Sequence, residues 1–404
     1  MTLKRKGFLT AAFLGAFWSL TISILVSVAM SFLTGAAFKP DLIYASLNGG
    51  AAGLLLLLCK GNSVPEVFLV LIFFTLGFLG TGALIIAQEV VISIKALAHS
   101  FYSIALIFPL ANILKDLSPR KMDKFDFEKT LMRFLIGLGF IIFSITIFIP
   151  FYVMIMTSLK SQQELILNPL DFSIEFSKGL KLFRSYYELF KDFGFAKYLY
   201  TSFYISFLTV VITLTFSIPG AYAVARLRFK GRGAFNQFIL LIYMVPMIVL
   251  ALPIYIIFSI TGLRNTLLGI VIIYPVTTIP VALYMLQGYF RGLPAEVEEA
   301  GLMDGLSRLS VIRHITLPLA LPALVSVSLY VFMISWNEFL LAFMLLDDPT
   351  KFTLTRGIAS LNSSEVPRQH LMAGAVISTI PIMILFLILE RFMTKGLAAG
   401  SIKG

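Results

Sequence analysis

Long apolar segments alternate with short polar ones along almost the whole chain of 404 residues. A helix needs about 20 apolar residues to cross the roughly 30 Å of hydrocarbon in a bilayer, and the pattern predicts ten such spans. They lie near residues 8–33, 41–59, 66–87, 92–114, 131–157, 199–224, 235–259, 267–289, 320–345 and 371–393. We therefore expect an all-α, polytopic membrane protein in which 41–59, short and rich in glycine, is the marginal span.

Composition and charge support this class. Apolar residues make up 58% of the chain and charged residues 13%, about half the charged share of a soluble domain. A net charge of +11 is compatible with nucleic-acid binding, but basic residues in a membrane protein more often report topology. They cluster where alternate spans end: Lys4, Arg5, Lys6, Lys115, Arg120, Lys121, Lys124, Lys129, Arg226, Arg228, Lys230, Arg232, Arg291, Arg308, Arg313, Lys395 and Lys403. This bias predicts cytoplasmic N- and C-termini, and we expect no nucleic-acid partner.

The first span has two interpretations. Its basic start, apolar run and small residues near 34–37 also describe a cleavable signal peptide. We favour an uncleaved anchor, because the apolar run is longer than that of most signal peptides and further spans follow. A single cysteine, Cys59, excludes an intrachain disulfide and argues against a cysteine metal cluster.

The polar segment between Pro294 and Pro322 stands out between two apolar spans. Three glutamates follow Pro294, which favours a short helix with acidic residues at the positive end of its dipole. Gly305 is expected to end that helix, and Ser307 can cap a second one. The pair Leu317-Pro318 predicts an extended residue before the next span.

This segment resembles the EAA loop of binding-protein-dependent ABC importer permeases. The match in residue and spacing consists of Glu299-Ala300-Gly301, Asp304-Gly305, Ile315, Leu317-Pro318 and Pro322. Gly301 departs from the second alanine of the motif, but both residues are small and permit close helix approach. A structural alternative is an ordinary amphipathic loop on the membrane surface, since short motifs also match by chance.

The resemblance extends over about 130–404 and is strongest to carbohydrate-type permeases of the maltose and glycerol-phosphate kind. Further landmarks are Gly220-Ala221-Tyr222-Ala223, Asn265-Thr266 and Trp336-Asn337-Glu338-Phe339. The charged stretch near 115–130 is the expected module boundary. We predict an extra N-terminal membrane region of about four helices at 1–118, and a permease core of six helices at 119–404 with the cytoplasmic EAA loop at 290–320.

The resemblance implies a function and a set of partners. It implies a permease subunit in a bacterial or archaeal inner membrane, which moves a sugar or related polyol delivered by an extracytoplasmic solute-binding protein. Two ABC ATPase subunits would bind ATP and Mg, no cofactor would bind to this chain, and a second permease, expected to be a different chain, would complete the pathway. The residues that it implies for ATPase coupling are Glu298, Glu299, Ala300, Gly301, Asp304, Gly305, Ile315, Leu317 and Pro318.

The sequence has no motif for chemistry of its own. It contains no GxxxxGK[ST] phosphate loop, no HExxH zinc helix and no GxSxG nucleophile elbow. Its three histidines, His99, His314 and His370, are far apart. We therefore expect neither a catalytic nor a metal site. Glu89, Lys95 and His99 are expected at a hydrated turn, with a proton relay as the alternative.

The ninth span carries a polar group of residues, Trp336, Asn337 and Glu338. A carboxylate in lipid costs several kcal/mol, so Glu338 should face a helix interface or a watered cavity. One interpretation is a sugar pathway, and the other is a structural hydrogen bond between helices. Four prolines, Pro246, Pro253, Pro275 and Pro280, are expected to interrupt the seventh and eighth spans, which would suit either a gate or plain packing.

Other classes stay open at this stage. An ion- or proton-coupled secondary transporter would need intramembrane carboxylates or broken helices in repeats, and Glu338 is the candidate. A membrane enzyme would need a clustered reactive group, which the sequence does not show. The sequence leaves open which sugar is carried, whether the permeases form a homodimer or a heterodimer, what the first four spans do and whether the first span is cleaved.

Overall fold

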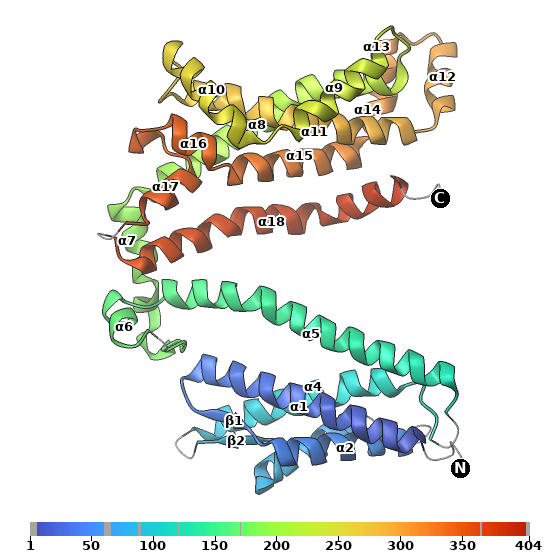
Figure 1. The fold of residues 1–404 in the computed structure, drawn as a ribbon, viewed down its shortest axis with the longest axis vertical. Coiled ribbons are helices and arrows are strands. Elements are labelled where there is room, and N and C mark those ends of the chain that lie inside the picture. The colour runs from blue at the N-terminus through green and yellow to red at the C-terminus, as the bar shows by residue number, and fades with distance from the viewer. Residues whose placement is uncertain are drawn as a thin grey trace. The chain divides into compact units, whose positions relative to one another are not determined.

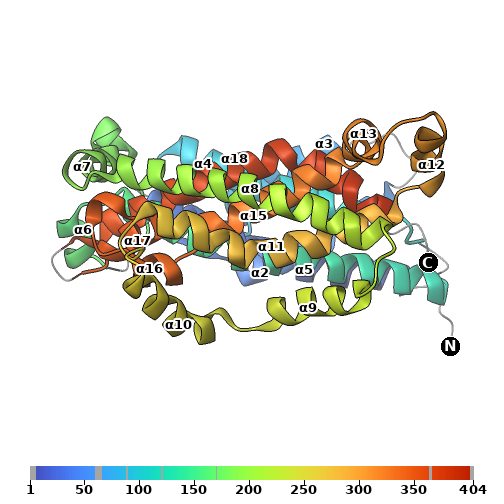
Figure 2. The same cartoon turned by 90° about the horizontal axis from the view of Figure 1, so that it is seen from above.

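The computed structural model describes residues 6–59, 66–87, 90–119, 122–169, 171–363 and 366–400. Within them the chain forms two compact units, Met1–Leu182 and Phe183–Gly404. The predicted all-α class is confirmed, since helices dominate and the described strands are two short ones. Figures 1 and 2 show both units as bundles of long helices.

The first unit packs four helices and one long helix around an apolar core. Its elements are α1 (Lys6–Thr34), β1 (Phe38–Pro40), α2 (Leu42–Leu58), α3 (Glu66–Leu76), the π-helix η2 (Gly77–Thr81), β2 (Leu84–Ile86), α4 (Ile92–Leu114), α5 (Lys124–Ser158), α6 (Gln162–Leu167) and most of the 3₁₀-helix η3 (Phe176–Phe183). The strands pair antiparallel, with Phe38 opposite Ile86. Helices α1 and α2 approach so closely at Gly15 that a Cβ there would collide with the carbonyl oxygen of Gly49.

The second unit contains the helices of the expected permease core that follow α5 and α6. They are α7 (Arg184–Asp192), α8 (Phe195–Arg226), α9 (Arg232–Met244), α10 (Met247–Ile260), α11 (Leu267–Gly292), α12 (Ala295–Met303), α13 (Arg308–Val311), η4 (π, Ile312–Thr316), α14 (Leu317–Leu319), α15 (Leu321–Asn337), α16 (Leu340–Leu345), η5 (3₁₀, Pro349–Lys351), α17 (Leu354–Ser360) and α18 (Arg368–Gly400). Helix α8 packs along α11 and α15, and α15 also packs on α18. Within this unit α12 and α13 lie at one end and α16 and α17 at the other (Figure 1).

The predicted spans coincide with observed helices. In the described residues six helices are long and apolar enough to cross a membrane, and a seventh span is possible if the pair 308–319 and 321–337, bent by 76°, counts as one. Three shorter apolar segments, Leu42–Leu58, Glu66–Thr81 and Met247–Ile260, correspond to three of the ten expected spans. The number of extra N-terminal spans is therefore supported only loosely, because two of those four are short.

Four expectations about local structure need correction. Of the four prolines, only Pro246 ends a helix, while Pro253, Pro275 and Pro280 lie inside continuous helices. The expected span at 320–345 is broken at Glu338, which separates α15 from α16. His99 is not at a hydrated turn, because it is buried in α4 against the Phe78 ring. Glu89 lies outside the described residues.

The fourth correction concerns Leu317-Pro318. Leu317 is helical, with φ −65° and ψ −44°, and not extended. The π-helical turn at 312–316 pairs the Leu317 amide with the Ile312 carbonyl, and this wider turn makes room for the following proline. The sharp bend falls two residues later, at Ala320.

The packing units do not divide where the sequence suggests a module boundary. The contacts place α5 and α6 with the four preceding helices, and the division falls after Leu182. The predicted regions 1–118 and 119–404 describe a resemblance in sequence, whereas compact units describe packing. The boundary near 118 therefore stays a prediction.

Candidate functional site

The resemblance to an EAA loop falls on a helical corner. Helix α12 ends at Met303, and Gly305 follows it with a φ of 87°, a left-handed conformation that glycine adopts without steric cost. The Ser307 hydroxyl accepts a hydrogen bond of 3.3 Å from the Ser310 amide and so caps α13. Pro294 is the residue before α12, not its first turn. The two short helices, the glycine turn and the serine cap are confirmed.

The inner face of this corner is tightly packed. Gly301 is buried, and a Cβ at this position would lie 2.5 Å from Cδ1 of Ile315 and 3.4 Å from Cγ2 of Val311. The small residue therefore lets α12 rest directly on η4 and α13. An alanine would fit only if the end of the Ile315 side chain moved slightly.

A carboxylate on the same face of α12 joins three parts of the chain. Glu298 is 8% exposed. The Tyr222 hydroxyl on α8 donates to its Oε2 at 3.1 Å, and the Thr316 hydroxyl on η4 donates to its Oε1 at 3.1 Å. The Arg226 Nε lies 3.4 Å from Oε1, a distance of ion pairing without a well-aligned hydrogen bond. We call Glu298, Tyr222, Arg226 and Thr316 the carboxylate joint.

The carboxylate joint is closed by a second contact of the arginine. Arg226 Nη2 donates to the Leu293 carbonyl at 2.7 Å, just before α12. A buried carboxylate is stable only when its charge is paired and its oxygens accept hydrogen bonds. Here two hydroxyls and one guanidinium meet that need, so α12, α8 and η4 are bound to one another by side chains.

The outer face of the corner is open. Glu299, Ala300, Asp304, Gly305 and Pro318 are exposed, while Ile315 and Leu317 are partly buried. Apolar side chains also lie on this face, with Met303 87% exposed and Leu309 76% exposed. The predicted coupling residues therefore divide into an exposed group and a buried pair, Glu298 and Gly301.

The structure places the three candidate pathway residues in different surroundings. Trp336 is buried, and its indole Nε1 donates to the Ser378 carbonyl at 3.1 Å. Asn337 is exposed and donates to the Met333 carbonyl of its own helix at 2.9 Å. Glu338 accepts from the backbone amides of Leu341 at 2.9 Å and Ala342 at 3.2 Å. Glu338 thus caps α16.

Sequence reasoning missed a row of buried hydroxyls on one side of α8. Its members are Thr201, Ser202, Ser206, Thr209, Thr213 and Ser217. Thr213 bonds the Thr278 hydroxyl of α11 at 2.7 Å, and Ser335 of α15 donates to Thr209 at 3.4 Å. From Ser202 onward, spacings of three and four residues put these positions on one helix face, so the row was detectable. Tyr222 and Thr316 gave no such signal.

The described residues contain no group of three or more His, Cys, Asp or Glu side chains placed to hold a metal ion. The three histidines are separate, and His370 pairs with Glu188 at 2.9 Å. His314 is exposed on η4 beside Ser310.

Comparison with known proteins identifies the class. A family model described as binding-protein-dependent transport system inner membrane component matches residues 217–398. An inner membrane ABC transporter permease protein of Escherichia coli strain K12, YcjP, is 36% identical over 285 residues, which is 69% of this chain and 99% of that protein. The trehalose/maltose transport system permease protein MalG of Thermococcus litoralis is 34% identical over 281 residues, 69% of this chain and 99% of its own length.

A solved structure shares the fold. A bacterial ABC transporter involved in the import of the acidic polysaccharide alginate aligns with a TM-score of 0.57 and 23% identity, over 67% of this chain and 98% of that one. The helical bundle and the relatives together define a multi-pass transport subunit of a cytoplasmic membrane. The chain belongs to the family of binding-protein-dependent transport system inner membrane components, which confirms the resemblance seen in the sequence.

Proposed function

We propose that this chain is the permease subunit of an ATP-driven importer that takes up a sugar or related polyol. The observation that carries the proposal is the match over nearly their whole length to ABC transporter permeases, one of them named for trehalose and maltose transport, together with the exposed helical corner at α12. The names of the relatives refer to trehalose and maltose transport, and they support carbohydrate as the substrate class. A solute-binding protein, a second permease and two ATPase subunits complete the assembly.

The outer face of the α12 corner is the proposed docking surface for an ATPase subunit. Glu299 and Asp304 offer carboxylates at its surface, while Met303 and Leu309 offer apolar side chains that water surrounds in the isolated chain. Exposed apolar side chains rimmed by polar ones are typical of protein interfaces. ATP and Mg would then be bound entirely by the partner.

The carboxylate joint is the proposed route by which this surface acts on the membrane spans. Because Glu298 is bonded to Tyr222 on α8 and to Thr316 on η4, a displacement of α12 pulls on both. ATP must stabilise one of two packings more than the other, since equal affinity for both would shift nothing. The buried hydroxyl row on α8 gives that helix polar contacts on which two packings could differ.

The orientation of the chain is part of the proposal. The clusters of Lys and Arg at alternate span ends place the α12 corner and both termini in the cytoplasm. The α16 and α17 end of the second unit then faces the side from which the binding protein delivers its solute. Asn337 is the exposed member of the three candidate pathway residues and is the best placed of them to meet solute.

Uptake into proteoliposomes tests the proposal. The complex is purified in mild detergent with its associated subunits, reconstituted with ATP inside the vesicles on the ATPase side, and given labelled maltose or trehalose with the binding protein. We expect uptake that requires ATP and is lost when Glu299 and Asp304 are both replaced by alanine. Uptake driven by a proton gradient and indifferent to ATP would instead favour a secondary transporter.

The pathway assignment has a separate test. Wild-type uptake by the double variant Asn337→Ala with Glu338→Gln would exclude these two side chains from the sugar pathway. A loss of uptake with an unchanged thermal midpoint would support it.

A further inference from the structure

Helix α5 has little packing in its middle. It is 35 residues long, and only 6% of its most apolar window is buried in the structure. Its contacts with the N-terminal helices are concentrated near its two ends. Each end has its own set of aromatic and polar partners.

The first set lies near the Lys124 end of α5. The Phe134 ring packs against Phe17 at 5.8 Å and Trp18 at 6.2 Å between centroids, both in edge geometry. A Cβ at Gly137 would lie 3.1 Å from the Trp18 ring. The Trp18 indole is itself fixed, because it donates to the Ala105 carbonyl of α4 at 3.1 Å.

An ion-pair group closes the same end. The Asp116 carboxylate lies just after α4. It pairs with the Lys129 ammonium at 2.8 Å and with the Arg133 guanidinium at 2.5 Å, both from α5. Hydrogen bonds from these two cations lower the pKa of Asp116 to about 2. The carboxylate is therefore charged over the physiological range and links α4 to α5.

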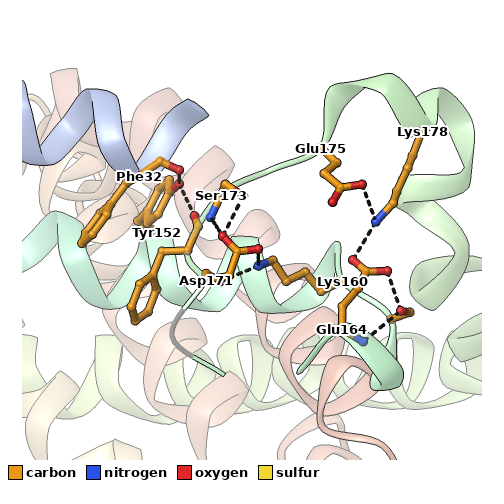
Figure 3. A network of polar contacts seen from close by, with 10 residues as sticks. Phe32, Tyr152, Lys160, Glu164, Asp171, Ser173, Glu175 and Lys178 are labelled. Carbon is orange, nitrogen blue, oxygen red and sulfur yellow. Dashed lines mark hydrogen bonds and ion pairs between the residues drawn. The ribbon is translucent and has the colours of Figure 1, made fainter. Parts of the chain in front are cut away.

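The second set lies near the Ser158 end and is drawn in Figure 3. The Tyr152 hydroxyl lies 2.7 Å from the carbonyl oxygens of both Phe32 in α1 and Phe172 in the segment after α6. The Phe32 ring stacks on Tyr152 at 5.7 Å and contacts Phe172 at 5.2 Å. One tyrosine thus joins α1, α5 and the 171–174 segment.

The 171–174 segment is held on its other side by Lys160. The Lys160 ammonium pairs with the Asp171 carboxylate at 2.7 Å and also bonds the Asp171 carbonyl oxygen. The Ser173 amide and hydroxyl donate to the same carboxylate at 3.0 and 2.7 Å. Burial alone would raise the pKa of Asp171, but the bonds from Lys160 and Ser173 outweigh it and lower that pKa to about 2.

Beyond this point the chain continues in a second ion-pair group. Lys178 pairs with Glu164 at 2.7 Å and with Glu175 at 3.1 Å. These contacts fold 160–178 back on itself next to the end of α5 (Figure 3).

The two sets are separated by most of the thickness of a membrane. Phe134 and Tyr152 are separated by about 27 Å of helix, and Trp18 and Phe32 by about 21 Å, at a rise of 1.5 Å per residue. A hydrocarbon core is about 30 Å thick. A helix held at one point can tilt about it, whereas a helix held at two points near opposite membrane surfaces has a fixed tilt.

We infer that the N-terminal helices are a brace for the first permease span. Helices α1 and α4 hold α5 at both ends, and α1 and α5 together hold the 171–174 segment, so that these elements stay together throughout the transport cycle. The inference rests on the proposed function only for the meaning of a transport cycle. It gives the four additional helices, which the relatives' length does not account for, a positioning role.

A disulfide across the Phe32 end tests the brace. A Cβ at Gly35 would lie 3.0 Å from the Ser173 Cβ, shorter than the roughly 3.8 Å that a disulfide prefers, so the two positions can be linked after a small outward shift. The variant is Gly35→Cys with Ser173→Cys in a Cys59→Ser background of the full chain. The matched control is Gly139→Cys with Ser173→Cys, because Gly139 is 13 residues from Tyr152 and about 20 Å away along α5.

We expect the Gly35 pair to link to the same extent with and without ATP and with and without solute, and the control pair not to link. Uptake by the linked protein should equal uptake after reduction. Linking that depends on ATP, uptake that returns only on reduction, or no linking at all would overturn the brace. If the reduced protein shows no ATP-driven uptake, the proposed function fails, while the linking yield still reports on the contact.

A second variant leaves Gly35 unchanged, because a cysteine at its φ of +71° would be strained. Phe172 is replaced by photoreactive benzoylphenylalanine, and the captured peptide is identified after illumination in the presence and absence of ATP. We expect capture within α1 near Phe32 or within α5 near Tyr152 in both conditions. Capture lost in one condition would contradict a permanent brace.

Discussion

Two glutamates of the second unit, Glu298 and Glu338, are held in opposite ways. Glu298 is bonded by side chains that lie 76 and 18 residues away in the sequence, on α8 and η4. Glu338 is bonded by backbone amides three and four residues ahead of it. The first arrangement ties separate elements together through side chains, whereas the second is made mainly by the backbone of the next helix, with the Tyr274 hydroxyl of α11 beside the carboxylate. Burial of a carboxylate in a permease therefore does not by itself indicate a solute site.

The two glutamates also differ in what the loss of their charge would cost in stability. Glu298 faces the guanidinium of Arg226, with 11% and 13% of the two side chains exposed, so its charge matters. Glu338 faces neutral amides, so an uncharged acceptor could replace it. Substitutions around each glutamate measure that difference in stability and uptake, and we expect the greater loss at Glu298.

Replacement of Glu298 by alanine should have the largest effect. It leaves Arg226 without its counter-charge and two buried hydroxyls without an acceptor, and we expect a loss of about 2–4 kcal/mol of stability. Thermal unfolding of the purified complex measures this, and uptake should fall with it. The control is Glu299→Ala, one residue along and exposed, which should change stability by no more than about 0.5 kcal/mol. Equal losses of stability in Glu298→Ala and Glu299→Ala would show that the buried contacts of Glu298 do not stabilise the fold.

Enlargement of Gly301 tests whether the packing beside the carboxylate joint matters as well. Gly301→Leu must push α12 away from Ile315, and overpacking of this kind costs about 1–3 kcal/mol. Gly301→Ala should be nearly neutral, because only the flexible end of Ile315 has to move. Unfolding midpoints of the two variants distinguish them. A leucine that is tolerated as well as an alanine would show that α12 does not rest on η4.

Removal of the Glu338 side chain should cost less. Loss of a helix cap costs about 1 kcal/mol, and Glu338→Gln should restore part of it, because its one amide oxygen can still accept from one of the two backbone amides. Unfolding and uptake are measured for both variants. If Glu338→Gln lowers uptake as much as Glu298→Gln, the charge of Glu338 has a role that its capping bonds do not explain.

The smallest single change is Tyr222→Phe, which deletes one hydroxyl of the carboxylate joint. We expect a loss of about 1 kcal/mol. In the Glu298→Ala background the same change should have almost no effect, since its partner is already absent. Full additivity of the two changes in a double-mutant cycle would show that the bond contributes nothing.

Much of this architecture was predictable because it follows from local patterns. Each of the ten apolar segments contains helix, although 66–87, 235–259 and 320–345 are interrupted, and the glycine turn at 305 and the serine cap at 307 form as expected. Spacing alone could also have revealed the hydroxyl row on α8. These features depend on residues within one or two helical turns of each other.

The failures have two physical causes, an unrecognised local turn and long-range packing. Leu317-Pro318 was expected to be extended, because the rule for residues before proline takes no account of a π-helical turn that makes room for the ring. His99 was expected at a hydrated turn but is buried by residues 77–82, which are distant in the sequence. The coupling role of Glu298 stays a prediction, but the orientation of its side chain toward Tyr222 gave no signal in the sequence, because it depends on how two separate helices pack. Long-range packing cannot be read from one sequence.

We propose above that the carboxylate joint carries movement of α12 to α8. The strongest test is the ratio of solute transported to ATP hydrolysed, measured in proteoliposomes with Glu298→Gln. The variant keeps one acceptor oxygen for the hydroxyls of Tyr222 and Thr316 but loses the charge that faces Arg226. We predict that the complex still assembles and hydrolyses ATP while uptake per ATP falls, because movement of α12 no longer reaches α8 fully. An unchanged ratio at a normal uptake rate would contradict the claim.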